Sequence, residues 1–424
     1  MKKLFLITII ALGTIKLQAQ TLKELVSSSV TNYPKLKELQ ANVALADEKV
    51  ALAKSGYQPN IAINGSYNYL APISKVTLPI PGMSGDIQFM PNHNYNANLS
   101  VQQTVWDFGR TNANVQKAKN DKTQIADNLK ANELNLAYQV AMIYNNIVLL
   151  NKNITLQDEQ IKFAQDNFKL ITNKIKNGDA LGFDSLNANV RVKIAQNRKV
   201  DLVNQLEKQL NLLRFYTGNQ AANVTAQRFE GNAIASIYPA LEHNADVLLA
   251  NDKVLAAEKD YKTSVANFLP NLFVNGSAGW KNAYMPNIND MRFNYVVGAG
   301  LTIPLYDGGR AVAQRKITKI AIDAAKQNLS YAQQNANKDL LQAQADLNAN
   351  KIRLENTRAI AQQAEAAFSL AQSRYKNGTL TWLDLENARI NVEDTRFSLI
   401  QLDYQIALNY LEVDRLSGIR FWEK

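Results

Sequence analysis

Cysteine is absent from this sequence of 424 residues. Its absence excludes disulfide bonds, thiolate metal sites, a thiol nucleophile and a lipid anchor on cysteine. Histidine occurs only at His93 and His243, and neither has a neighbour at the spacing of a metal site or an acid–base pair. A phosphate-binding Gly-Lys-Ser/Thr loop is missing as well. We therefore expect no enzyme activity, no metal and no cofactor.

Long apolar runs are missing after residue 20, so no membrane-spanning helix is predicted there. The first residues of the chain, however, contain a short apolar run. Lys2 and Lys3 precede the apolar run Leu4 to Leu12, and the small Ala19 precedes a plausible cleavage point. This order is typical of a signal peptide, which we place at residues 1–19, and it predicts an exported mature chain.

The chain is basic, with 47 Lys and Arg residues against 37 Asp and Glu residues and a net charge of +10. Three of these charges, at Lys2, Lys3 and Lys16, would leave with the leader and lower the charge to +7. The rest are spread among acidic residues without a dense basic run, which is typical of solvated helix faces. Nucleic acid is not an expected partner.

The chain contains one unit written twice. Asp107 to Arg110 reads Asp-Phe-Gly-Arg, and Asp307 to Arg310 reads Asp-Gly-Gly-Arg. The same offset of 200 relates further pairs: Phe168 and Phe368, Asn177-Gly178 and Asn377-Gly378, Asp184 and Asp384, Gly218 and Gly418. Upstream the offset is 211, so eleven extra residues lie within a predicted loop between Leu70 and Tyr95.

Each half is predicted as a helix, two strands, a very long helix, a tight turn and a second helix. We assign a first repeat at 20–218, a linker at 219–239, a second repeat at 240–418 and a tail at 419–424. The helices that lead into the strands are expected at 22–55 and 240–265.

Four segments alternate between apolar and polar residues with the period of a β-strand. They are 60–69, 95–102, 272–280 and 293–303. One face carries aliphatic and aromatic side chains, and the other carries Asn, Ser, Thr, Gln and Gly, which suits lipid on one side and water on the other. A sheet packed on a soluble core also alternates, but no other segment looks like a core to cover these strands.

Four strands cannot close a membrane barrel, because the unpaired groups of an open edge are too costly in hydrocarbon. Several copies must therefore share one barrel. Twelve strands from three copies begin to leave an open lumen, so a conduit favours a trimer.

The segment from Arg110 to Lys176 lacks proline and glycine and predicts a single helix of 67 residues. Its apolar residues recur at spacings of three and four, as in a coiled coil. The second half keeps this pattern. Asn-Gly ends both long helices, and a second helix follows to about Tyr216 and Leu416, which makes two helical hairpins with tips at 177–183 and 377–383.

These features resemble the outer-membrane efflux proteins typified by TolC. The resemblance covers essentially the whole mature chain and depends on the duplicated element order, the Asp-x-Gly-Arg motifs and the second tip, 374–384. It implies a mainly α fold with long antiparallel coiled-coil hairpins and four β-strands per chain. Three chains would share a 12-stranded barrel in the outer membrane and a helical tunnel in the periplasm.

The resemblance also implies the function and the partners. The chain would be the outer-membrane channel of a tripartite efflux or type I secretion system. It would be a passive conduit in contact with outer-membrane lipid. A periplasmic adaptor (membrane fusion protein) would dock on its tips, and an inner-membrane pump of the RND or ABC type would supply the energy. Drug or metal efflux and protein export both fit the sequence.

The resemblance places the pore gate and the adaptor-docking turns at the tips. The gate candidates are Tyr375, Asp384, Asn387 and Asp184. The docking candidates are Asn177, Gly178, Leu181, Asn377, Gly378, Thr379, Leu380 and Thr381. The family often has an acidic residue where this chain has Asn387, and an arginine where it has Leu380.

Structural roles compete with gating at these positions. Asp384 stands three residues after Thr381 and fits a helix cap, as does its repeat mate Asp184. Tyr375 occupies a heptad position and fits simple packing. A periplasmic coiled-coil adaptor or scaffold without a barrel is the alternative for the whole chain; it would explain the helices but not the four strands.

Overall fold

The computed structural model describes residues 21–77, 86–178, 181–224, 228–231 and 243–423. The predicted signal peptide lies outside these residues. Contacts group the chain into two compact units, each built from both repeats. The hairpin unit comprises Met1–Glu38, Leu129–Val247 and Gln333–Lys424, and the sheet unit comprises Leu39–Asn128 and Leu248–Ala332.

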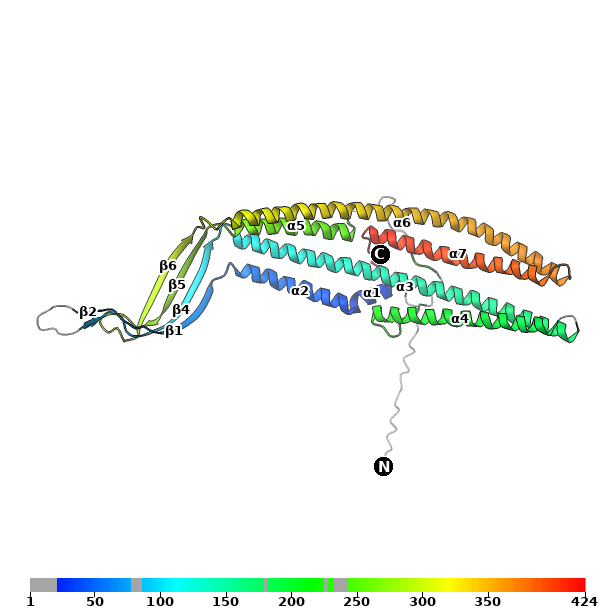
Figure 1. Ribbon diagram of the computed structural model, residues 1–424, viewed down its shortest axis with the longest axis horizontal. Coiled ribbons are helices and arrows are strands. Elements are labelled where there is room, and N and C mark those ends of the chain that lie inside the picture. Colours follow the sequence, from blue (N-terminus) through cyan, green and yellow to red (C-terminus); the bar gives the residue numbers. More distant parts are fainter. Residues whose placement is uncertain (1–20, 78–85, 179–180, 225–227, 232–242, 424) are drawn as a thin grey trace, which may run out of the picture. The chain divides into compact units, whose positions relative to one another are not determined.

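The sheet unit contains one antiparallel sheet of four strands in the order β1-β4-β5-β6 (Figure 1). The strands are β1 (Asn60–Tyr69), β4 (His93–Trp106), β5 (Asn271–Lys281) and β6 (Arg292–Thr302). All four predicted strands are confirmed. The segment predicted as a loop between Leu70 and Tyr95 additionally holds a small hairpin of β2 (Lys75–Thr77) and β3 (Asp86–Gln88). Strands of three residues are too short to show an alternation in the sequence.

The two repeats form strand pairs in the same register. Asn60 lies opposite Gln102 in the first pair, and Asn271 lies opposite Thr302 in the second. These positions are related by the offsets of 211 and 200 found in the sequence. Across the sheet, apolar residues therefore line up with apolar ones: Ile63, Leu99, Ala278 and Tyr295 stand in one row.

Neither face of this sheet is covered by the described part of the chain. Every residue of β1 is exposed, on the apolar face as well as the polar one. The exposed fraction is 86% for Ile63, 75% for Tyr295 and 81% for Val297. Apolar side chains of a protein that folds in water are normally buried on one face of an antiparallel sheet. This sheet is therefore not packed on a soluble core.

Most of the described residues lie in helices. The helices are α1 (Leu22–Asn32), α2 (Pro34–Ser55), α3 (Arg110–Lys176), α4 (Gly182–Thr217), α5 (Ala245–Ala266), α6 (Arg310–Lys376) and α7 (Trp382–Leu416). The predicted bounds of α3 are confirmed, and α6 has the same length of 67 residues. Among the described residues, no helix combines the length and the apolarity needed to cross a membrane.

The segment predicted as one helix over 22–55 is two helices. Tyr33 is extended, with φ −64° and ψ 121°, and ends α1. Pro34 begins α2, where a residue without an N–H group is tolerated in the first turn. The clash of the proline ring with the preceding residue disfavours a helical conformation at Tyr33.

The hairpin unit holds most of the buried core. On α3, Ala137, Val140, Ile147 and Val148 are fully buried, and Leu213 on α4 is buried with them. A second cluster joins Leu340 and Ala343 of α6 to Val413 and Leu416 of α7. In Figure 1 α3 runs beside α4, and α6 beside α7. These pairs are the predicted hairpins.

Candidate functional site at the hairpin tips

The second tip is a tight turn between α6 and α7. Gly378 has φ +76°, in the left-handed region that glycine adopts without strain. The Gly378 N–H donates to the Tyr375 carbonyl at 3.1 Å, and the Thr379 N–H donates to the Arg374 carbonyl at 3.0 Å. These bonds satisfy carbonyls that the helix end would otherwise leave free. The turn thus holds Thr379, Leu380 and Thr381 outside the helices.

The first tip uses the same device. Gly178 has φ +85°, and its N–H donates to the Ile175 carbonyl at 3.0 Å. The Asn177 N–H donates to the carbonyls of Asn173 and Lys174. Space does not select glycine at either tip, because a Cβ at Gly178 or Gly378 would meet no atom within 4 Å. The backbone conformation selects it.

The start of α7 is capped as the sequence predicts. The Thr381 hydroxyl accepts a hydrogen bond from the Asp384 N–H at 3.2 Å. The same hydroxyl donates to the Asp384 carboxylate at 2.6 Å. Asp384 remains exposed, so its negative charge faces solvent at the positive end of the helix dipole.

The start of α4 is held by a different contact. The Asp184 carboxylate accepts from the Leu181 N–H at 3.0 Å. Leu181 has no hydroxyl to return the bond, and its side chain is 71% exposed. Both aspartates therefore take part in hydrogen bonding at a helix start. The Asp184 carboxylate accepts from a backbone N–H, and the Asp384 carboxylate accepts from the hydroxyl that caps α7.

Tyr375 packs between the two hairpins of the chain. Its ring meets Trp382 edge to face with centroids 5.6 Å apart, and Lys174 Nζ lies 5.2 Å from its centre. These contacts match the packing role that its heptad position predicts.

The other predicted site residues lie at or near the tip surfaces. Asn177, Asn377, Gly378, Thr379, Thr381 and Asn387 are exposed, and Leu380 is half-buried. The turn residues leave backbone and side-chain groups open to a partner. Their docking role stays a prediction.

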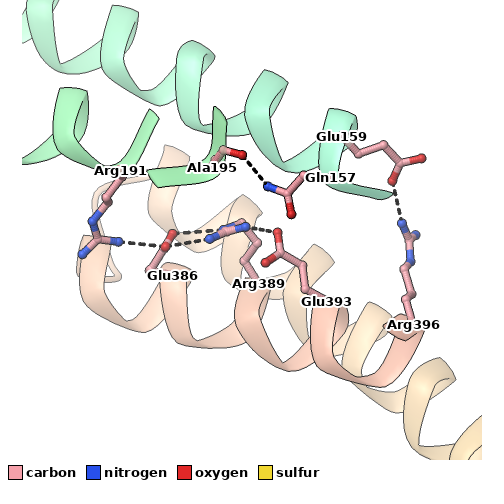
Figure 2. A network of polar contacts seen from close by, with 8 residues as sticks. All are labelled: Gln157, Glu159, Arg191, Ala195, Glu386, Arg389, Glu393 and Arg396. Atoms are coloured by element: carbon pink, nitrogen blue, oxygen red, sulfur yellow. Dashed lines mark hydrogen bonds and ion pairs between the residues drawn. The ribbon is translucent and has the colours of Figure 1, made fainter. Parts of the chain in front are cut away.

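A network of charged side chains, which the sequence reasoning did not find, joins the two hairpins (Figure 2). Glu386 of α7 has a side chain only 8% exposed. Arg191 of α4 donates to it at 2.8 Å across the hairpins. Arg389, one turn further along α7, donates to both carboxylate oxygens of Glu386, at 3.1 and 2.7 Å.

Arg389 is the centre of this network. Besides Glu386 it contacts the Glu393 carboxylate. Its guanidinium also lies 4.8 Å from the centre of the Phe163 ring of α3, and that ring stacks on Trp382 with centroids 6.2 Å apart. A buried carboxylate is tolerated when its charge is paired and its oxygens are hydrogen-bonded, which Arg389 and Arg191 achieve together.

Further along the hairpins, Arg396 of α7 forms a second bridge. It pairs with Glu159 of α3 at 3.1 Å and with Glu365 of α6 at 3.0 Å. All three side chains are well exposed, so this bridge is screened by solvent and is weaker than the buried one.

Part of this network has a signal in the sequence. Glu386, Arg389 and Glu393 follow one another at spacings of three and four, which places opposite charges on one helix face. That pattern predicts only pairing within α7. The cross-hairpin partner Arg191 is 195 residues away and becomes visible only when the helices are packed.

Paired helical hairpins and a four-stranded sheet with an uncovered apolar face indicate the class of the protein: one that works at a membrane. The sequence model of the outer membrane efflux protein family matches residues 25–219 and 236–419. The chain belongs to that family. It is an outer-membrane efflux channel protein, with its helical part in the periplasm.

Curated relatives match along almost the whole chain. The outer membrane efflux protein BepC of Brucella suis is 24% identical over 96% of this chain and 88% of its own length. The outer membrane protein TolC of Vibrio cholerae is 22% identical over 99% of this chain and 96% of its own. Cation efflux proteins named CusC from Escherichia coli also match, at 18% identity.

Solved structures share the fold. The outer membrane protein VceC of Vibrio cholerae aligns with a TM-score of 0.78 at 20% identity, over 94% of this chain and 96% of its own. A CusC structure aligns with the same TM-score at 16% identity, over 94% of this chain and 92% of its own. The predicted fold class is confirmed.

Proposed function

We propose that this chain is the outer-membrane channel of a tripartite export assembly, in which three copies form one passive conduit. The observation that carries this proposal is the sheet. It has four strands, two open edges and an apolar face exposed in the described chain. Hydrocarbon would cover that face, and neighbouring copies would pair with the edges, since lipid does not tolerate unpaired backbone groups.

The length of the helices supports a conduit that extends beyond the membrane. Each of α3 and α6 has 67 residues. At 1.5 Å per residue such a helix is about 100 Å long, several times the thickness of a bilayer. The helices would therefore line a periplasmic passage, and the strands would line its membrane exit.

The partners follow from the lack of an energy source. The sequence holds no phosphate-binding loop, so the work of transport would come from an inner-membrane pump of the RND or ABC type. A periplasmic adaptor would link that pump to the exposed turns around Gly178 and Gly378. The relatives' names mention efflux, and CusC is named for cations, which supports small solutes as the cargo.

The gate would lie at the tips. Asp384 is exposed, and three copies would place three such carboxylates around one axis. A ring of like charges attracts cations and repels itself, which makes a narrow aperture selective and adjustable. Asp184, Asn387 and Tyr375 would contribute the rest of the constriction, in addition to their packing and capping contacts.

The proposal is tested with purified protein in detergent. Light scattering should give the mass of three chains, and planar bilayers should show discrete cation-preferring conductance steps. A monodisperse monomer, or a protein that salt washing releases from the membrane fraction, would refute the shared channel.

A further inference from the structure

In the sheet unit the two repeats meet at one inner boundary. Each repeat also has an outer strand, and each of these outer edges is half of a boundary of the same kind. Inside the chain, β4 of the first repeat pairs with β5 of the second. At the outer limits, β1 pairs only with β4, and β6 pairs only with β5, among the described strands. The repeat symmetry makes β6 equivalent to β4 and β1 equivalent to β5, so the outer edges should fit each other as the inner strands do.

An arginine closes the inner boundary. Arg110, the first residue of α3, donates from Nε to the Ala266 carbonyl at 3.3 Å and from Nη2 to the Leu269 carbonyl at 2.7 Å. These carbonyls lie at the end of α5, where helical hydrogen bonding leaves acceptors free and a positive charge is favourable. Arg110 is half-buried in this position.

Its repeat mate has no such acceptor within the described chain. Arg310, the first residue of α6, is exposed, and its Nε donates only to the carbonyl of Asp307, three residues away. The local backbone is otherwise the same. Asp107 caps the Gly109 N–H at 3.0 Å, and Asp307 caps the Gly309 N–H at 3.0 Å.

The missing acceptors exist at the other edge of the unit. The offset of 211 relates Ala266 and Leu269, at the end of α5, to Ser55 and Gln58, at the end of α2. The turns are alike: the Leu269 N–H donates to the Ala266 carbonyl at 3.2 Å, and the Gln58 N–H donates to the Ser55 carbonyl at 2.9 Å. Ala266 is buried, whereas Ser55 and Gln58 are exposed.

Apolar side chains flank both half-boundaries. On α2, Leu45 and Leu52 stand two helical turns apart and are 53% and 73% exposed. On α6, Ile317 and Ile320 are 60% and 66% exposed. Leucines at a spacing of seven are typical of a helix seam that a second helix covers. The occupant with a complementary seam and matching strand edge is a second copy of this chain.

We infer that Arg310 of one copy donates to the carbonyls of the next copy's Ser55 and Gln58, and that β6 pairs with the next copy's β1 in the register of the inner boundary. In that inner register Gln102 lies opposite Asn275. The offsets then set Thr302 opposite the next copy's Asn64. This inference rests on the proposed shared channel and adds the atoms that join its copies.

Disulfide trapping tests the register, and the lack of native cysteine makes the chain suited to it. Thr302→Cys with Asn64→Cys should give covalent multimers up to a closed ring on non-reducing gels after oxidation. Thr302→Cys with Ser66→Cys is the control that is two residues out of register on the same face, and it should cross-link several-fold less. Opposite positions bring Cβ atoms close, whereas diagonal ones lie well beyond disulfide reach.

The internal pair Gln102→Cys with Asn275→Cys calibrates the experiment. It has the same local geometry inside one chain, so it should link without changing the mass of the chain. If this pair links and Thr302→Cys with Asn64→Cys does not, the inferred register is wrong. Stronger linking of the Ser66 pair would also overturn it.

Two arginine variants test the contact itself. Arg310→Ala should lower the temperature at which the trimer separates into chains on semi-native gels, by several degrees, while the helix content at that temperature stays unchanged. Arg310→Lys should recover only part of the loss, because one ammonium cannot fork to two carbonyls. Arg110→Ala should instead destabilise the chain internally.

The failures are distinguishable. A trimer of Arg310→Ala that separates at the parent temperature overturns the arginine contact. If the parent is a trimer with another register, only this inference fails. If light scattering finds the parent to be a monomer, the channel proposal fails as well.

Discussion

The two hairpin tips descend from one repeated unit, yet they hold themselves in different ways. The second tip concentrates polar contacts: the Thr381–Asp384 cap and the buried Glu386–Arg389 pair. At the matching positions of the first tip stand Leu181 and Leu186, which are 71% and 68% exposed. Both repeats thus keep the same turn geometry but differ in the side chains next to the turn. The second hairpin carries most of the charged network that joins the two hairpins, and the first presents exposed apolar side chains.

Among the substitutions at the tips, Arg389→Ala should cause the largest loss of stability. It removes both hydrogen bonds to the buried Glu386 and the stacking on Phe163. Breaking a buried charge pair from one side costs about 3–5 kcal/mol, so the thermal unfolding midpoint followed by circular dichroism should fall clearly.

Arg191→Ala is the matched control for that change. Arg191 is 47% exposed and provides one bond to Glu386, so its loss should cost on the order of 1 kcal/mol. Equal losses for the two variants would contradict the central role of Arg389.

Substitutions at the turn glycines should cause the next largest loss of stability. Gly378→Pro cannot adopt φ +76° and loses the N–H that bonds to Tyr375, which should distort the second tip at a cost of about 3 kcal/mol. We expect pump-dependent resistance to disappear in cells that carry the variant, while the trimer survives extraction.

Gly378→Ala separates the local strain from the docking role. Its cost should be about 1–2 kcal/mol, because only the left-handed conformation opposes the new methyl group. Gly178→Ala should cost the same amount of stability. If resistance falls equally with both, the two tips are equivalent for docking.

The two aspartates should give smaller changes in stability. Asp384→Ala and Asp184→Ala each remove a negative charge from the first turn of a helix, worth about 0.3–1 kcal/mol. Single-channel conductance distinguishes them. Asp384→Ala should raise conductance or relieve cation block if that carboxylate lines the aperture, and unchanged conductance would leave capping as its only role.

The smallest effect concerns a carboxyl group on the second hairpin that the first hairpin lacks. Asp403 of α7 corresponds to the exposed Val203 of α4. Burial raises the pKa of Asp403, and the positive charges of Arg358 and Lys152 offset this only in part. Because the pKa of Asp403 is raised in the folded chain, the contribution of this group to stability is greatest at low pH and is lost as pH rises through that pKa.

Asp403→Asn should therefore be slightly more stable than the parent at neutral pH. The difference should vanish as the pH falls below the pKa of Asp403, which unfolding midpoints at several pH values would reveal. A larger advantage at low pH than at neutral pH would contradict the assigned cause.

The sequence predicts the long helices and the four main strands of this fold well because each of them leaves a local signal. The bounds of α3 follow from 67 residues without proline or glycine between the Asp-Phe-Gly-Arg motif and Asn177-Gly178. The strand pairs follow from alternation, and even their shared register follows from the repeat offsets. The break at Pro34 was not predicted, although it has a local signal, since proline restricts the residue before it.

What the sequence does not predict depends on packing between distant segments. The Arg191–Glu386 bond joins two helices whose separation in the chain gives no periodic signal. Likewise, Arg110 and Arg310 occupy equivalent positions in the sequence. Only the structure shows that Arg110 donates to carbonyls at the end of α5, whereas Arg310 donates to the nearby Asp307 carbonyl. The cap at the start of α7 was predictable because Thr381 and Asp384, which form it, lie only three residues apart.

The uncovered sheet has a thermodynamic consequence. A solitary copy in water would expose its apolar rows and both strand edges. In the shared channel proposed above, much of the folding free energy would therefore be released only on assembly. The midpoint of chemical unfolding should then rise with protein concentration, as mass action requires when subunits fold and associate together. For such a chain, a stability quoted without a concentration has no meaning.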